Sequence, residues 1–266
     1  MFKTFHRYLK ILLLQHVFGA GKDLSLRGNF IVTMIGSLCF FYLHLISFGL
    51  IISRFHFPGW SEGELWVLLF TFEIFTYLAF YLLWRGLNQL PREINRGTYD
   101  VLLTKPVNSR FISYFRNGSF HNLLSALLGL SYLIYTLKKY QLLVSFPAIF
   151  LYCFSLATSL WIFHCLGLIF TSINFRHGFI PGTSSAAFEI QEIFKYPADI
   201  FTPSPFWQKF LIYPTVLMTT IPTVALLTKP ISQELILAYL LVFIIFTFLS
   251  HQVWSSALRN YSSASS

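Results

Sequence analysis

The stretch Phe30–Ile52 reads FIVTMIGSLCFFYLHLISFGLII and contains no Asp, Glu, Lys or Arg. A run of this kind is long enough for a transmembrane helix, because about 20 apolar residues cross the hydrocarbon core. The composition agrees along the whole chain, since 55% of its 266 residues are hydrophobic and only 11% are charged. A soluble domain of this size could not bury so much apolar surface. The pattern indicates an all-α polytopic membrane protein and excludes an ordinary soluble enzyme.

Four further runs have the same character and extend the pattern along the chain. They are Leu65–Trp84, Phe120–Leu137, Leu142–Phe170 and Leu235–Trp254. In the third of these runs, Pro147 is expected in the first turn of the helix, where proline costs little. The whole chain, residues 1–266, is expected to form a single transmembrane domain.

A sixth crossing is expected at one of two positions. Phe210–Thr228 is apolar but contains Pro214 and Pro222. Proline is tolerated in membrane helices when neighbouring groups satisfy the freed carbonyl. Alternatively, Phe179–Ile200 is the crossing, and Phe201–Thr228 forms a broken or re-entrant helical pair on the outer side. Both versions predict six transmembrane helices.

The distribution of positive charge predicts the orientation of the chain. Its net charge is +9, from 19 Lys and Arg against 10 Asp and Glu. If both termini are cytosolic, most of these cations lie inside, and the outer side keeps Arg54, Lys138, Lys139 and Lys229. The positive-inside rule therefore favours this orientation. The cations are spread between apolar runs and form no continuous stripe, which argues against nucleic-acid binding.

The first segment, Phe2–Phe18, predicts an amphipathic helix. Its apolar residues recur at helical spacing, whereas Lys3, Arg7 and Lys10 fall on the other side. A basic amphipathic helix of this kind lies in the headgroup plane of the membrane. The cost of burying three cations argues against an additional crossing here.

Leu90–Pro106, after the second crossing, is the cytosolic segment best suited to contact a partner. Pro91 fits the first position of a short helix. Glu93 near the positive end of that helix and Arg96 near its negative end both suit its dipole, and Gly97 fits the position that ends it. Tyr99–Leu103 then offers a small apolar surface. Such a segment fits a docking element, or alternatively a plain connector.

Two motifs here resemble a known family. Glu93–Asn108, EINRGTYDVLLTKPVN, is similar to a motif of ABC transporter type-2 permeases, in particular a subgroup of six-span bacterial exporter permeases. Phe194–Phe201, FKYPADIF, followed by Trp207 and Ile221-Pro222, resembles a later motif of the same subgroup. Tyr99 stands where the family usually has Leu, Thr104 interrupts the usual leucine run, and a proline expected soon after Pro222 is absent.

The resemblance implies a transmembrane permease subunit of an ATP-driven exporter in the bacterial cytoplasmic membrane. Its expected partners are a separate ABC ATPase subunit, a second permease subunit (the same or a different chain) and membrane lipids. Leu90–Pro106 would be the coupling segment that contacts the ATPase. The residues expected to couple the two subunits are Glu93, Arg96, Gly97, Asp100, Lys105 and Pro106.

The chain shows no motif for chemistry of its own. Gly19–Asp23 superficially resembles a phosphate-binding loop, but His16 stands where the first Gly belongs and Asp23 replaces the Ser or Thr. ATP and Mg²⁺ are therefore expected in the partner ATPase, and no cofactor and no catalytic residue is predicted in this chain. The eight His show no metal-ligand spacing, so no metal is predicted either.

Glu73 is the most unusual single residue, because a carboxylate in the middle of a crossing is costly unless it is paired or faces water. His44, deep in the first crossing, is its candidate partner. The pair fits a substrate pathway, and it also fits a purely structural hydrogen bond. Glu192 would lie on the same pathway if Phe179–Ile200 crosses the membrane, and in solvent otherwise. Two other functions remain open: a membrane-embedded lipid-modifying enzyme, and a stand-alone carrier or channel.

Overall fold

The computed structural model describes residues 2–116, 118–201 and 204–261, without the side chains of residues 2–5, 206, 207 and 209–211. The described residues form helices joined by short turns, with no β-strand among them. In chain order these are α1 (Phe2–Ser25), α2 (Arg27–Arg54), α3 (Glu62–Ala79), the π-helix η1 (Phe80–Trp84), α4 (Arg85–Asn95), α5 (Asp100–Leu103), α6 (Ser109–Tyr114), α7 (Phe120–Lys139), α8 (Phe146–Ser172), α9 (Asn174–His177), α10 (Ala186–Ile190), the 3₁₀ helices η2 (Gln191–Lys195) and η3 (Ala198–Phe201), α11 (Phe206–Leu227) and α12 (Gln233–Arg259).

Five helices in the described part of the chain are long and apolar enough to cross a membrane. They are Arg27–Arg54, Glu62–Asn95, Phe120–Lys139, Phe146–His177 and Gln233–Arg259. These helices confirm the all-α polytopic class. Pro147 stands in the first turn of α8, as expected, next to the Ser145 hydroxyl that caps the helix.

One helix of 34 residues, Glu62–Asn95, joins α3, η1 and α4 without interruption. It begins at a capping box in which Ser61 and Glu64 bond each other's backbone N–H groups. The predicted start of a new helix at Pro91 is wrong, because Pro91 lies inside α4. The helix has already been nucleated by the preceding crossing, so Pro91 only removes one hydrogen bond from an existing ladder.

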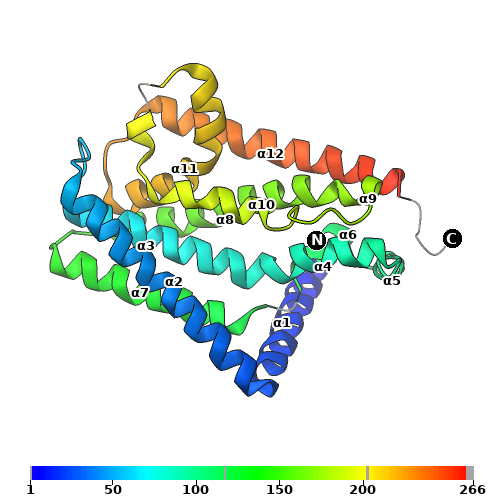
Figure 1. Cartoon of the computed structure of the whole chain (residues 1–266). Coiled ribbons are helices and arrows are strands. Elements are labelled where there is room, and N and C mark those ends of the chain that lie inside the picture. The colour runs from blue at the N-terminus through cyan, green and yellow to red at the C-terminus, as the bar shows by residue number, and fades with distance from the viewer. Residues whose placement is uncertain (1, 117, 202–203, 262–266) are drawn as a thin grey trace.

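The most buried helices lie at the centre of the bundle (Figure 1). α3 packs against α7 and α11, and α8 packs against α11 and α12. Phe75 of α3 contacts Phe163 of α8 and Phe194 of η2, each with ring centroids 5.5 Å apart. α2 and α12, in contrast, expose many large apolar side chains, including Val32, Phe40, Leu50, Leu237 and Phe248. This outward apolar face is what a lipid environment requires.

Residues 178–201 run alongside the long helix in the opposite direction, through α10, η2 and η3. At the α4 end, the Ser184 hydroxyl donates to Asn88 Oδ1 at 2.9 Å. At the other end, the indole N–H of Trp60, just before α3, donates to Asp199 at 2.9 Å. This segment therefore crosses the bundle from one end to the other, although it is not one continuous helix.

α11 is one helix of 22 residues, and Pro214 and Pro222 lie inside it. Tyr213 in α11 contacts Glu234 in the first turn of α12 at 3.5 Å. Lys229, just after α11, pairs with Glu64 in the first turn of α3 at 2.9 Å. Which of the two segments, Phe179–Ile200 or Phe210–Thr228, is the sixth crossing stays a prediction.

α1 is longer than the expected Phe2–Phe18 and lies at a steep angle to the bundle helices (Figure 1). Its Asp23 pairs with Arg85 at the start of α4 and accepts the backbone N–H of Phe120 at 2.9 Å. Its start and the end of α12 both lie at the end of the bundle that carries α4, α5 and α6 (Figure 1). Both ends of the described chain are thus on one side of the bundle.

Candidate functional site

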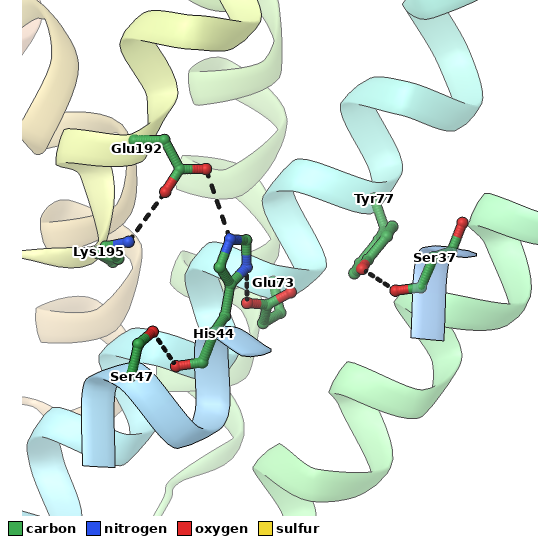
Figure 2. Close-up of polar contacts among 7 residues, drawn as sticks. All are labelled: Ser37, His44, Ser47, Glu73, Tyr77, Glu192 and Lys195. Carbon is green, nitrogen blue, oxygen red and sulfur yellow. Dashed lines mark hydrogen bonds and ion pairs between the residues drawn. The ribbon is translucent and has the colours of Figure 1, made fainter. Parts of the chain in front are cut away.

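His44 lies between two carboxylates in the middle of the bundle (Figure 2). Its Nδ1 is 2.7 Å from Glu73 Oε1, and its Nε2 is 3.5 Å from Glu192 Oε1. The other oxygen of Glu192 accepts a hydrogen bond from Lys195 Nζ at 2.9 Å. The cluster thus joins α2, α3 and η2, and it brings together all three residues expected on a substrate pathway.

The members of this cluster differ sharply in exposure. The Glu73 side chain is fully buried, and its Oε2 has no hydrogen-bond partner among the described residues. The side chain of His44 is 17% exposed, whereas that of Glu192 is 51% exposed. The His44 imidazole therefore lies between a buried carboxylate, that of Glu73, and an accessible one, that of Glu192. One turn after Glu73, the Tyr77 hydroxyl donates to the Ser37 carbonyl at 2.7 Å and also ties α3 to α2 (Figure 2).

α4 ends close to Gly97, where the sequence predicts the end of the helix. Gly97 has a φ of +69°, a left-handed conformation that favours glycine, and α4 ends just before it. The chain then turns back, and the Tyr99 N–H donates to the Glu93 carbonyl at 3.2 Å. Arg96, Lys105 and Pro106 are exposed around this turn. Asp100 begins α5 and is partly buried.

The predicted apolar surface over Tyr99–Leu103 is only half present. Val101 and Leu103 are 62% and 41% exposed. Tyr99 and Leu102, in contrast, point inward and are buried. Residues on opposite sides of a single helical turn cannot all face solvent, so only Val101 and Leu103 remain as an outer surface.

An aromatic cluster beneath this turn holds it to the bundle. The Tyr99 ring contacts Phe175 and Tyr261 edge-on, with centroids 5.1 Å and 5.9 Å apart, and Phe175 also contacts Trp254. The Tyr99 and Ser113 hydroxyls are 3.2 Å apart. Burial raises the pKa of the Tyr99 hydroxyl to about 12. The cluster connects the turn to α9 and to the end of α12.

Glu93 faces inward, where it pairs with the buried guanidinium of Arg116 at 2.5 Å. α1 also holds this region: Arg7 donates to the Pro106 carbonyl at 2.8 Å, and the Asn108 N–H donates to the Tyr8 hydroxyl at 3.0 Å. Of the residues expected to couple to the ATPase, Glu93 therefore supports the turn from inside, whereas Arg96, Lys105 and Pro106 form its exposed rim.

Sequence reasoning missed Arg116 and Lys195. No local pattern links Arg116 to Glu93, because the two residues are 23 positions apart in the chain. Lys195 had one available signal, since it follows Glu192 at helical i, i+3 spacing. No group of three or more His, Cys, Asp or Glu that could hold a metal occurs within residues 2–116, 118–201 and 204–261.

Comparison with known proteins gives one family match. Residues 33–265 match the family model described as "ABC-2 family transporter protein". No curated protein matches the chain. The match covers the polar cluster, the turn after α4 and all helices from α3 to α12, whereas α1 and the first residues of α2 lie outside it.

Proposed function

Because the chain belongs to the ABC-2 transporter family and is a membrane permease component, we propose that it couples to a separate ATPase and exports cargo. Leu90–Pro106 contacts the ATPase, and a second permease subunit, identical or different, completes the substrate path. ATP and Mg²⁺ are bound and used by the ATPase subunit. The protein lies in the bacterial cytoplasmic membrane with both termini in the cytosol.

One observation carries this proposal: the uninterrupted helix Glu62–Asn95. It contains Glu73 of the polar cluster and ends directly at Gly97, where the coupling turn begins. A helix transmits a displacement along its axis, because its backbone hydrogen bonds resist bending and stretching. A push on the turn is therefore carried toward the α3 side of the cluster through one continuous run of helix, which includes η1 and Pro91.

The exposed rim of the turn supplies the contact surface. Val101 and Leu103 offer an apolar centre, and Arg96 and Lys105 surround it with positive charge. An apolar centre with a polar rim is the usual composition of a protein interface. The complementary groove on the ATPase is apolar and carries acidic residues at its edge.

The polar cluster supplies the path. A half-exposed carboxylate such as Glu192 is costly against lipid tails, so it faces water or another subunit. The face formed by α2 and residues 178–201 therefore borders the path between two permease subunits. Cargo passing along it meets Glu192 and His44 first, with Glu73 behind them.

The test is gentle purification of the tagged protein from its native membrane, followed by mass spectrometry. We expect an ATPase subunit in the wild-type sample and its loss on Val101→Asp. The matched control is Leu143→Asp, which makes the same kind of change at a residue 91% exposed in the turn between α7 and α8. Equal recovery of the ATPase with both variants would contradict the proposed contact. A wild-type chain that stays alone while other membrane complexes survive would contradict the function.

A further inference from the structure

Within the described residues, the ion pair between His44 and Glu192 is the only one that joins α2 to residues 178–201. Lys195 also pairs with Glu192, but both belong to η2, so that contact joins no separate elements. The neighbouring Phe48–Tyr196 contact, with centroids 6.3 Å apart, is apolar. The charge on the His44 ring therefore controls how strongly α2 holds this crossing.

Both ring nitrogens of His44 face carboxylate oxygens. A neutral imidazole donates from one nitrogen only, and its other nitrogen presents a lone pair. If the ring is neutral and keeps its short bond to Glu73 at 2.7 Å, that lone pair faces Glu192 and repels its carboxylate. Only the imidazolium donates to both. The arrangement thus requires one proton more than a neutral ring between two carboxylates carries, held on the ring or on Glu73.

We propose that Glu73–His44–Glu192 is a proton-dependent bridge that holds the crossing 178–201 against α2 and α3. When the ring is protonated, the bridge is closed. As the pH rises and the ring loses its proton to water, the Glu192 half opens, while the buried Glu73 half remains. The bridge regulates the proposed export path, and its physiological meaning rests on that proposed function.

The surroundings of the ring favour movement of the Glu192 half. From α3, Glu73 faces the ring, and Tyr77 lies one turn further along; from η2, Glu192 faces it, and Lys195 holds the far oxygen of Glu192. Lys195 competes for Glu192 and keeps that carboxylate ionised after the ring releases it. Residues 178–201 are short helices and turns rather than a continuous helix, so part of the crossing can shift without breaking a long hydrogen-bond ladder.

The bridge can be measured as a distance in the full-length protein. Spin labels are attached at Leu50→Cys in α2 and Ile193→Cys in η2, both at exposed positions, in a background lacking Cys39, Cys153 and Cys165. The protein is placed in lipid nanodiscs with an excess of unlabelled copies, so that distances within one chain dominate. Dipolar electron paramagnetic resonance then compares pH 6 with about pH 10.5, because two neighbouring carboxylates favour the protonated ring well above neutral pH. We expect the population at longer distance to grow by about fivefold or more at the higher pH.

Matched variants decide the cause of the change. His44→Gln and Glu192→Gln should remove the pH response, and His44→Gln should show the long-distance population at both pH values. Glu189→Gln alters an exposed carboxylate one turn earlier and should keep the full response. A wild-type distance that does not change with pH, or the same change in His44→Gln, would overturn the bridge. Because no ATPase is present, either result is separate from the copurification that tests the export function.

Discussion

Arg116 Nη2 lies 2.5 Å from Glu93 Oε2. This ion pair joins the last turn of α4 to the residues that follow α6. The Arg116 side chain is only 8% exposed. A cation buried to this degree is retained where its partner satisfies it. Glu93, expected on sequence grounds to contact the ATPase, is in this structure part of the internal support of the coupling turn.

Arg116→Ala should destabilise the protein by about 3 kcal/mol, because it leaves the Glu93 carboxylate partly buried and unpaired. Thermal unfolding of the purified protein in detergent measures this change. Arg96→Ala, at the exposed end of the same helix, should change stability by less than about 0.5 kcal/mol. Equal effects of the two variants would show that the pair does not support α4.

Gly86→Ala should destabilise the protein by about 1–3 kcal/mol through overpacking. A Cβ at this position would lie 2.3 Å from the Tyr114 carbonyl oxygen and 2.6 Å from its Cα, and backbone atoms cannot move aside cheaply. Gly36→Ala is the matched control, since its Cβ would meet nothing within 4 Å. Alanine at position 36 should be neutral or slightly stabilising, because it improves helix propensity. Thermal unfolding compares the two directly, and a Gly86→Ala protein as stable as Gly36→Ala would contradict the close packing of α4 on α6.

Gly97→Ala should weaken the coupling turn by about 1 kcal/mol, because a φ of +69° is unfavourable for a residue with a Cβ. Gly97→Asn should cost less, since asparagine tolerates the left-handed region better. The measurement is the amount of ATPase recovered with each variant at equal expression. If alanine and asparagine retained the ATPase equally with wild type, the conformation at Gly97 would have no part in coupling.

The path of residues 178–201 can be tested by labelling from each side of the membrane. In a background without the native cysteines, His177→Cys should react with an impermeant thiol reagent only from the cytosolic side. Ile200→Cys should react only from the outside, because Asp199 beside it contacts Trp60 at the other end of the bundle. Thr98→Cys and Gln141→Cys serve as inner and outer references. Labelling of both test positions from one side would make this segment a loop.

Glu73→Gln should preserve folding and recovery of the ATPase, because the amide oxygen can still accept the bond from His44 Nδ1. Glu73→Ala should lower stability by about 3 kcal/mol, since it leaves the ring without its buried partner. Size-exclusion profiles and thermal unfolding distinguish the two variants. If export by Glu73→Gln matched the wild type, the charge of Glu73 would have no role in transport.

Much of the site was accessible from local patterns. The stop at Gly97 and the start of α8 at Pro147 depend on the conformational preferences of single residues, which act over one turn. The His44–Glu73 pair was predictable because a carboxylate within an apolar run requires a partner from a neighbouring helix. Glu192 was the conditional member of this set, since its place depended on the unknown path of residues 179–200.

Other features had no local signal. The division of Tyr99–Leu103 into two buried and two exposed apolar side chains depends on which side of a single turn meets Phe175 and Tyr261. The Arg116–Glu93 pair joins residues on either side of two short helices, and neither residue differs in type from the exposed cations and carboxylates near it. Pro91 was misread as a helix start because local propensity does not include the support of a helix that already exists.

Hydropathy and charge alone were enough to define a multi-pass helical membrane protein with five clear crossings, since burial in lipid acts on each run of residues independently. Tertiary packing decided the features that hydropathy and charge could not predict. Residues 178–201 run along the bundle as short helices and turns, and they pack against α3, α8 and α11. The same packing brings Glu192 to His44, a pairing that depends on three elements distant in the chain and is therefore a property of the tertiary structure.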